Sequence, residues 1–386
     1  MKQTFILFLF IVLSSSSTIT GDDCGLDCHW KFDNETGILE ISGTGEMENP
    51  YEPYSPFGDY STFFTEITKI IINEGITTIA NYYFSGLFNV KTVSLPQSLK
   101  KIDRYVFAKN FALESINLPN NLISVGEYVF QNCASLKSIS IPPSLVTLSS
   151  YFCSSCSTLE EVVFHDQFLI INEYAFVGCG SLKIVSIPPS VTYIGTGAFS
   201  YCYSLPKISI PEKISAIPVD FCLHCSSLVD LTIPSTVKKI LSNAFAYSTN
   251  LITVSLPGSI EQIDKTAFYK CHSLETFLYK GSQSPICGEK VFYGTHVSIV
   301  NTYTDYNSDQ FCGITTKKSI TPKQTADQKN ENNMKILTVS LSVIGSVFGL
   351  IILVGIAIIV YAAVVFRKDK LFRELNDNKK NLVVQA

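Results

Sequence analysis

Apolar positions recur along the middle of this chain with a period of 23 residues that does not slip. Counted from one aromatic position, the same slot falls at Phe84, Phe107, Phe130, Cys153, Phe176, Phe199, Cys222, Phe245 and Phe268. A fixed period in the twenties is the signature of a solenoid, in which each repeat buries its apolar side against its neighbours. Solenoids mostly bind other molecules through an extended surface, so the period constrains the fold more tightly than the function.

Within one repeat the pattern predicts a short β-strand that ends at a proline. Ile139 and Ile141 alternate with Ser140, as in a strand with one buried face. Pro142 follows, and proline ends a strand because it has no N–H to donate. Stacking places successive strands about 4.8 Å apart. We therefore expect a β-rich solenoid, either a rod or a horseshoe, over residues 67–278.

The repeat motif also resembles a known family. The pattern L-x-x-I-x-I-P-x-x-[LVI]-x-x-I-x-x-x-A-F-x-x-C is nearly complete at 182–202 and 251–271. It resembles the BspA-like leucine-rich repeats, which occur on surface proteins of mucosa-dwelling bacteria and anaerobic protists. The run C-G…W…G-x-L-x-I-S-G-x-G-x-M between Cys24 and Met47 is similar to the leader module of that family, placed here at 21–66. The resemblance covers about residues 24–316 and implies a leucine-rich-repeat ectodomain acting in adhesion, without a named ligand.

The N-terminal residues predict a secretory signal peptide over residues 1–20. A basic Lys2 precedes the apolar run Phe5–Leu13, and small polar residues follow it. We expect cleavage between Ser17 and Asp22. A buried N-terminal strand is the alternative interpretation.

The C-terminal part predicts a membrane anchor. Residues 336–366 contain no charged residue and are long enough for one transmembrane α-helix. Basic residues follow it, so residues 367–386 are expected to be cytoplasmic and the repeats extracellular, in a single-pass plasma-membrane protein. Residues 317–335 are polar and predict a flexible stalk. Gly345 and Gly349 form a GxxxG motif, which predicts a helix face for homodimer formation.

The chain has twelve cysteines, and a signal peptide would place them in a compartment that permits disulfides. Six of them lie three residues after the slot: Cys133, Cys156, Cys179, Cys202, Cys225 and Cys271. Buried thiols that pack like small apolar side chains are the favoured interpretation of this column. Disulfides between adjacent rows also fit the geometry that a bridge needs.

The Cys-x-x-Cys pairs at 153–156 and 222–225 resemble zinc ligands, but they lie three repeats, or roughly 14 Å, apart and cannot share one ion. Metal binding is therefore not predicted. Two bridges are expected outside the column: Cys24–Cys28 in the leader, and Cys287–Cys312 in a C-terminal cap over residues 279–316.

Composition and charge favour a binding protein over an enzyme. The net charge of −4 does not indicate a nucleic-acid partner. The five histidines are scattered and form no unit with a Ser or Cys nucleophile. We therefore expect a protein that is not an enzyme and needs no cofactor. The sequon at Asn34 predicts a glycosylation site near the N-terminus.

The outward positions of the strands suggest where a ligand binds. Most are small and polar, but one repeat departs from this pattern at Glu160, Glu161 and Val163, and has His165 where other repeats have proline. Ile184 faces outward in the next repeat. These five residues predict an acidic and apolar ligand-binding patch. Repeat drift on an inert face is the alternative.

Together these features predict a cell-surface protein that mediates adhesion, with a host-cell or extracellular-matrix protein or glycan as its partner. A structural or variable surface antigen without a dedicated ligand is the second interpretation. A signalling receptor is disfavoured, because the short tail shows no docking module.

Overall fold

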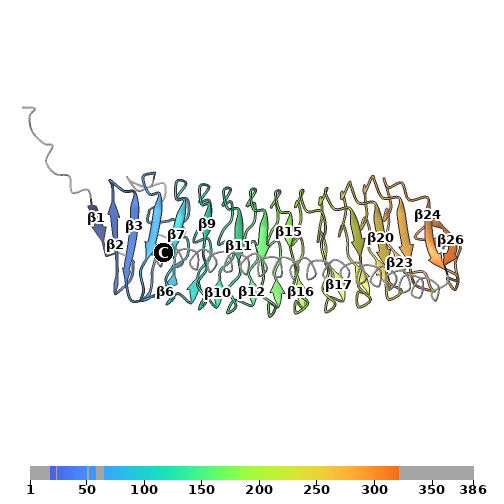
Figure 1. The fold of residues 1–386 in the computed structure, drawn as a ribbon, viewed down its shortest axis with the longest axis horizontal. Coiled ribbons are helices and arrows are strands. Elements are labelled where there is room, and N and C mark those ends of the chain that lie inside the picture. Colours follow the sequence, from blue (N-terminus) through green and yellow to red (C-terminus); the bar gives the residue numbers. More distant parts are fainter. Residues whose placement is uncertain (1–17, 23, 50–51, 58–64, 321–386) are drawn as a thin grey trace, which may run out of the picture. The chain divides into compact units, whose positions relative to one another are not determined.

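Each 23-residue repeat forms one row of a β-solenoid in which successive rows pair in parallel (Figure 1). The structure, a computed structural model, describes residues 18–22, 24–49, 52–57 and 65–320. The chain divides into two compact units, residues 1–319 and 320–386, and the first unit is described by itself. The predicted β-rich solenoid is therefore present in the described part of the chain.

Most rows contribute one strand to a first strand face and one strand to a second strand face; the row that contains Pro206 contributes only a second-face strand, Ala216–Ile217. Strands of the first face, with those of the two ends, are β1 (Thr18–Gly21), β2 (Cys28–Asp33), β3 (Ile38–Gly43), β5 (Lys69–Ile72), β7 (Thr92–Ser94), β9 (Ser115–Ile116), β11 (Ser138–Ser140), β13 (Glu161–Val163), β15 (Ile184–Val185), β18 (Asp230–Thr232), β20 (Thr253–Leu256), β22 (Thr276–Tyr279), β24 (Ile299–Tyr303), β25 (Gln310–Phe311) and β26 (Ile314–Ile320). Strands of the second face are β4 (Gly45–Glu46), β6 (Ile76–Ile79), β8 (Lys101–Ile102), β10 (Ser124–Val125), β12 (Thr147–Leu148), β14 (Ile170–Ile171), β16 (Tyr193–Ile194), β17 (Ala216–Ile217), β19 (Lys239–Ile240), β21 (Gln262–Ile263) and β23 (Ile286–Cys287).

The pairing register equals the sequence period. Thr92 of β7 pairs with Ser115 of β9, and Ser138 of β11 pairs with Glu161 of β13. Side chains therefore form columns, because residues one period apart stack on one another. The middle residue of each short first-face strand, such as Ile139, is buried, while its neighbours face outward.

The aromatic slot lies on a third side of each row, which we call the turn edge. Here two residues per row, two before and two after the slot, have left-handed backbones; Tyr82 has φ 59° and Gly86 has φ 76°. This geometry turns three N–H groups toward the next row. The N–H groups of Tyr82, Phe84 and Gly86 donate to the carbonyls of Arg104, Val106 and Ala108 at 3.0, 3.1 and 2.8 Å. The turn edge is thus a hydrogen-bonded ladder in its own right.

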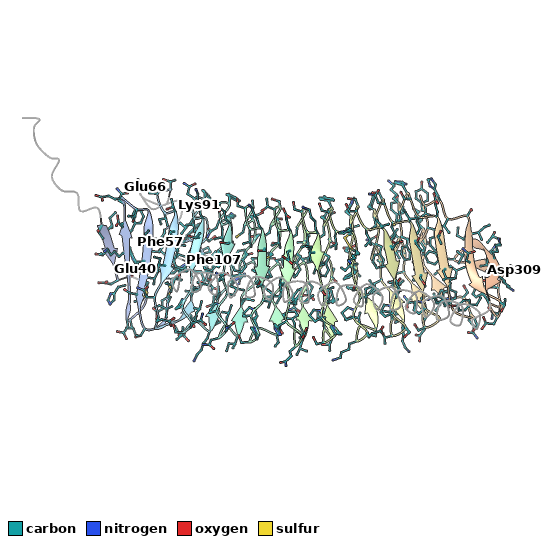
Figure 2. All side chains as sticks on the ribbon, in the orientation of Figure 1. Glu40, Phe57, Glu66, Lys91, Phe107 and Asp309 are labelled. Atoms are coloured by element: carbon teal, nitrogen blue, oxygen red, sulfur yellow. A yellow bond between two sulfur atoms is a disulfide. The ribbon has the colours of Figure 1, made fainter. Side chains whose placement is uncertain are left out.

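Phenylalanine rings stack along the interior beside this ladder. The rings of Phe84 and Phe107 lie 5.8 Å apart at 7°, and the column continues to Phe130. Two rows have cysteine in the slot, and the sequence did not indicate what fills the space there. The preceding residues, Phe152 and Phe221, enter the column edge-on. Figure 2 labels Phe107 among the rows near the N-terminal end of the solenoid.

The cysteine column is a row of buried hydrogen-bond donors. Cys133 Sγ donates to the Phe107 carbonyl at 3.2 Å, and Cys271 Sγ donates to the Phe245 carbonyl at 3.2 Å. Ser248 takes the same place in its row and donates to the Cys222 carbonyl at 3.4 Å. The column therefore stabilises the turn edge through S–H and O–H groups, in addition to packing.

Three disulfides are present. Cys24–Cys28 and Cys287–Cys312 are the two bridges expected from the sequence. The third, Cys222–Cys225, lies inside the column and joins two residues of one row. From the sequence we predicted that any disulfide in the column would join adjacent rows. The bridge lies within one row instead, because the Cys-x-x-Cys spacing gives a Cα–Cα distance of 5.4 Å, which also suits a disulfide. Six cysteines remain free and buried: Cys133, Cys153, Cys156, Cys179, Cys202 and Cys271.

The N-terminal end of the solenoid is covered by an antiparallel meander. Strand β1 pairs with β2, β2 pairs with β3, and β3 begins the parallel stack by pairing with β5. The leader thus serves as the cap, which removes an exposed sheet edge. Strand β1 starts at Thr18, inside the range 1–20 predicted as signal peptide. Within the predicted cleavage window of Ser17 to Asp22, cleavage directly after Ser17 keeps all of β1, whereas cleavage between Thr18 and Gly21 would divide the strand.

The C-terminal end contains one more row than the sequence predicted. Strand β22 pairs with β24 in parallel, and Phe292 stacks on Phe268 at 6.0 Å and 10°. The spacing between these two rings is 24 residues, so a single inserted residue conceals the repeat. The cap proper is the antiparallel hairpin of β25 and β26.

Strand β26 runs to Ile320, so the first residues of the predicted stalk, 317–320, belong to a strand and not to a flexible segment. The rest of the predicted stalk, the predicted transmembrane helix with Gly345 and Gly349, and the predicted tail lie outside the described residues, as do residues 1–17. Within the described ranges, no helix is long and apolar enough to cross a membrane.

Both strand faces are interrupted in the row that contains Pro206 and Pro218. Equivalent residues in other rows donate their N–H to the preceding row: Lys183 donates to the Glu160 carbonyl, and Gly195 donates to the Ile171 carbonyl. Proline has no N–H, so neither bond can form. Across this junction no backbone hydrogen bond joins strand segments that the structure describes, and a cavity of about 280 Å³ opens between Tyr193 and Pro218.

Among the described residues, the backbone hydrogen bonds that cross this junction lie on the turn edge and at the corner after it, where the Ser227 N–H donates to the Tyr203 carbonyl at 3.0 Å. The N–H groups of Gly197, Phe199 and Tyr201 donate to the next row at 2.9, 3.1 and 2.7 Å. A weaker interruption separates β10 from β12, where the Ser149 hydroxyl, rather than a backbone N–H, donates to the Val125 carbonyl.

We expect the proline row to exchange its amide hydrogens faster than rows with complete ladders. Unpaired amides lack the protection of a hydrogen bond, and interrupted sheets open locally at low cost. Hydrogen–deuterium exchange with mass spectrometry measures this: peptides spanning 214–219 should exchange faster than peptides spanning 237–242, one row later. Equal protection of the two segments would contradict the assignment of this junction as a discontinuity.

Burial raises the pKa of the Cys271 thiol to about 12. In the unfolded chain a thiol ionises near pH 8.5. A folded-state pKa above the unfolded value gives stability that is complete below pH about 8.5 and is lost as the pH rises toward 12. The Cys271→Ser variant places serine where the preceding row has Ser248, and it lacks this thiol. As the pH rises above 8.5, we expect the unfolding free energy of the parent to fall more steeply than that of the variant, by about 1.4 kcal/mol per pH unit. Denaturant titrations at pH 7.5 and 9.5 test this, and parallel pH profiles for the two chains would refute it.

Candidate functional site

The first strand face presents a long, mostly small and polar surface. Outward side chains are serine or threonine in β7, β9, β11 and β20. Against this background two apolar side chains stand out, because Val163 is 46% exposed and Ile184 is 57% exposed. An exposed branched apolar pair on an otherwise polar sheet is the type of feature that marks an interaction surface.

The structure brings three of the five predicted patch residues together. Glu161 of β13 pairs in register with Ile184 of β15, so these side chains are direct neighbours on the face. Val163 lies two residues farther along β13 and therefore points to the same side. Glu161, Val163 and Ile184 form one surface, which we call the first-face patch.

The other two predicted residues are engaged elsewhere. Glu160 precedes β13 and forms an exposed ion pair with Lys183 at 3.2 Å, a type of interaction worth at most about 1 kcal/mol. His165 is half-buried; its Nε2 lies 3.0 Å from the Leu145 carbonyl, and its ring packs edge-on against Phe168. His165 occupies the position that is proline in most other rows, and its ring stabilises the turn there. Its side chain is therefore not part of the surface formed by Glu161, Val163 and Ile184.

Asn34 lies in the turn between β2 and β3, and its side chain is exposed. The Asp33 carboxylate fixes this turn by accepting hydrogen bonds from the Glu35 and Thr36 N–H groups at 2.9 and 3.3 Å. The sequon is accessible, and its glycosylation stays a prediction.

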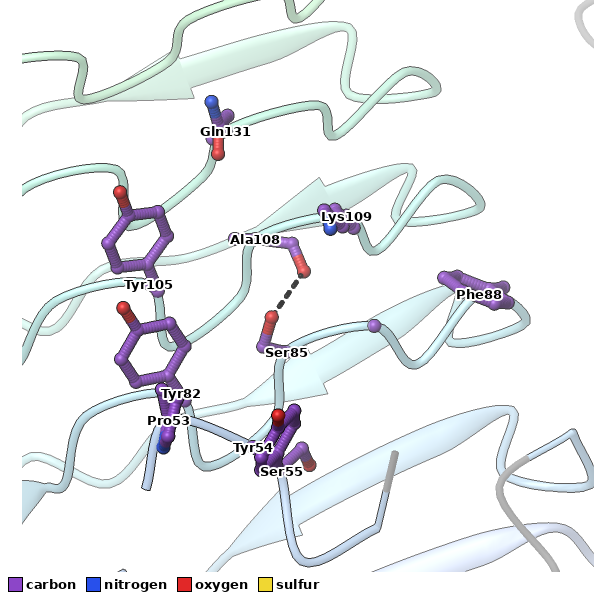
Figure 3. Close-up of a pocket in the computed structure, with 11 residues that line it drawn as sticks. Pro53, Tyr54, Ser55, Tyr82, Ser85, Phe88, Tyr105, Ala108, Lys109 and Gln131 are labelled. Carbon is purple, nitrogen blue, oxygen red and sulfur yellow. Dashed lines mark hydrogen bonds between the residues drawn. The ribbon is translucent and has the colours of Figure 1, made fainter. Parts of the chain in front are cut away.

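A second candidate site, which the sequence analysis missed, lies on the turn edge near the N-terminal cap. It is a pocket of about 360 Å³ between the cap segment at Tyr54 and the rows that carry Tyr82, Tyr105 and Gln131 (Figure 3). Its floor is the turn in which the Ser85 hydroxyl donates to the Ala108 carbonyl at 3.2 Å. We call this site the turn-edge pocket.

One wall of the turn-edge pocket belongs to a stack of tyrosines. The rings of Tyr82, Tyr105, Tyr128, Tyr151 and Tyr174 lie 4.4 to 5.0 Å from their neighbours. A tyrosine every 23 residues two positions before the slot is a signal in the sequence that could have revealed the stack. The left-handed backbone that exposes these rings along the turn edge could not be read from the residue type, because tyrosine rarely adopts it.

Burial raises the pKa of Tyr82, and burial together with Tyr151 raises the pKa of Tyr128 to about 12. These phenols therefore stay neutral and can donate hydrogen bonds. In the described parts of the chain, no group of three or more His, Cys, Asp or Glu side chains is arranged to hold a metal ion. The lining of the turn-edge pocket offers aromatic rings, hydroxyls and one charged side chain, Lys109.

Comparisons with known proteins agree with this fold. A family model described as a BspA type leucine rich repeat region, in six copies, matches residues 57–183 and 170–298. No curated protein matches the chain.

Among solved structures, a leucine-rich repeat protein from Eubacterium ventriosum is 20% identical, with a TM-score of 0.40, over 77% of this chain and 99% of that chain. A leucine-rich repeat protein from Bacteroides ovatus is 20% identical, with a TM-score of 0.38, over 78% of this chain and all of that chain. The pneumococcal vaccine antigen PcpA is 17% identical, with a TM-score of 0.40, over 77% of this chain and 88% of that chain. Because the family model spans more than half of the sequence, the chain belongs to the BspA-type leucine-rich repeat family.

Proposed function

We propose that this chain is a cell-surface protein that mediates adhesion by binding protein or glycan through its repeat domain. The observation that carries the proposal is the first-face patch, where Glu161, Val163 and Ile184 interrupt a polar sheet face. The predicted signal peptide and the predicted membrane span at 336–366 support an extracellular repeat domain held at the plasma membrane.

The composition of the patch suits a protein partner. Apolar side chains at the centre of a contact lose water on binding and supply most of its free energy, while a charge beside them contributes specificity. The two apolar side chains contribute only a modest area, so a single contact is weak. Many copies on one cell surface raise the overall strength through avidity.

We infer binding rather than catalysis for the first-face patch. Its one carboxylate, Glu161, has Ser138 and Ile184 as its neighbours in register, and the His165 ring lies against the Leu145 carbonyl. A surface antigen without a dedicated ligand is the competing function, because most of the first strand face is small and polar. The two functions differ in whether the chain binds a target saturably.

We expect the triple variant E161K/V163S/I184S, in the full-length chain expressed on cells, to reduce saturable binding to host cells or matrix proteins by at least about tenfold. The apolar contacts are lost and the carboxylate is reversed, so an electropositive partner is repelled. Asp230→Lys is the matched control: Asp230 occupies the Glu161 column in β18, outside the patch, and its reversal should leave binding unchanged.

Binding curves from flow cytometry, with surface expression checked by antibody, give the result. Equal binding by the triple variant and the parent would remove the patch from the proposal. Absence of saturable binding by the parent itself, with the chain folded on the surface, would favour the antigen without a ligand.

A further inference from the structure

We propose that the turn-edge pocket binds a carboxylate-bearing sugar unit, such as a uronic or sialic acid residue of a surface glycan. The proposal deepens the binding function proposed above, on which it rests, but it uses a surface separate from the first-face patch. Its argument depends on the size of the pocket, on its charge and on its aromatic and hydroxyl groups.

The pocket is large enough for a monosaccharide or a disaccharide. Its volume of about 360 Å³ lies at the small end of the range for small-molecule sites. Two residues after the aromatic slot, this row has Gly86, whereas the next row has Lys109 at the equivalent position. The missing side chain at Gly86 leaves the space of the pocket. A Cβ on Gly86 would meet only Phe88 at 3.8 Å within 4 Å, so the glycine leaves the pocket open on that side.

The pocket lining carries a cation, Lys109. Lys109 is exposed and forms no ion pair with a residue that the structure describes. A second cation lies outside the lining: the Arg104 guanidinium is 5.5 Å from the centre of the Tyr105 ring. The carboxylate near Tyr82 belongs to Glu52, which accepts hydrogen bonds from Asn81 Nδ2 at 3.2 and 3.3 Å.

Among the described residues that line the pocket, Lys109 is the one charged side chain, in a chain whose net charge is −4. An unpaired ammonium at the rim of a pocket attracts a ligand carboxylate through a charge-assisted hydrogen bond. This favours an acidic ligand over a neutral one.

The remaining groups suit a sugar ring. The Ser85 hydroxyl donates to the Ala108 carbonyl, which leaves its oxygen lone pairs to accept from sugar hydroxyls. The rings of Tyr82 and Tyr105 lie one above the other beside Ser85, and their hydroxyls point to the same side (Figure 3). The Tyr54 ring is 56% exposed, and the negative face of an aromatic ring attracts the polarised C–H groups of a sugar.

The test uses the full-length chain in detergent micelles, with glucuronic acid and N-acetylneuraminic acid as probes and glucose as the neutral control. Saturation-transfer NMR titrations should show saturable binding of at least one acid, about tenfold tighter than glucose, and weaker at high salt. Lys109→Gln should weaken that acid about tenfold, and Tyr54→Ala should weaken acid and glucose alike.

Lys270→Gln is the matched control for the lysine. Lys270 occupies the same slot as Lys109 in a distant row, with its Nζ 5.4 Å from the Tyr247 ring, and lies outside the pocket. Its substitution should leave acid binding unchanged. Lys109 is exposed and Lys270 is half-buried, so circular dichroism of each variant is the check that the chain is folded.

Three results would overturn the proposal: no acid binds, the two lysine variants weaken binding equally, or a glutamate-rich peptide binds at Lys109 while neither sugar acid does. The outcome separates from that of the adhesion proposal. If no sugar acid binds, but cell-surface binding persists in Lys109→Gln and is lost in E161K/V163S/I184S, the adhesion proposal stands and the pocket proposal is rejected. If the parent chain binds a sugar acid but no cell surface, the pocket proposal stands and the adhesion proposal is rejected.

Discussion

The hydrogen-bonded ladder of the turn edge is the constraint on which the rest of the structure depends. Three N–H groups per row donate to the next row, and the geometry requires two left-handed residues around the aromatic slot. A non-glycine residue pays about 1–2 kcal/mol for that conformation, and each hydrogen bond returns about 0.5–1.5 kcal/mol. The ladder continues across the row of Pro206 and Pro218, where both strand faces stop, so it joins rows that the sheets do not.

The interior columns follow from this ladder. A slot held between two left-handed residues places its ring at the same height in every row, so the phenylalanines from Phe84 onward stack at 5.6–6.0 Å wherever phenylalanine follows phenylalanine in the slot. The residue three positions later lies against a carbonyl of the preceding row, 26 residues back. A small side chain with one hydrogen to donate satisfies that carbonyl, which explains the free cysteines of the column and Ser248; Cys225 is bridged to Cys222 and has no S–H to donate.

The sequence predicted the fold well because its signals are periodic. Strand positions, buried columns, the leader cap and the bridges Cys24–Cys28 and Cys287–Cys312 all followed from spacing or from the family resemblance. It failed where the period changes by one residue, as before Phe292, and where backbone conformation decides. Residue type alone did not show that Tyr82 and Lys109 have left-handed backbones. It also did not show that Pro206 and Pro218 occupy the positions whose N–H groups, in other rows, donate to the preceding row on the two strand faces.

The candidate sites were harder to predict than the fold for a related reason. The patch residues Glu161, Val163 and Ile184 could be identified because strand alternation states which side chains face outward. His165 could not be excluded, since its bond to the Leu145 carbonyl depends on the shape of a turn. The turn-edge pocket exists because a glycine in one row is followed by a lysine in the next. Because the buried columns and the turn-edge ladder hold each row in place, such outward positions can differ from row to row without cost to the stack, and recognition is expected where single rows depart from the repeat.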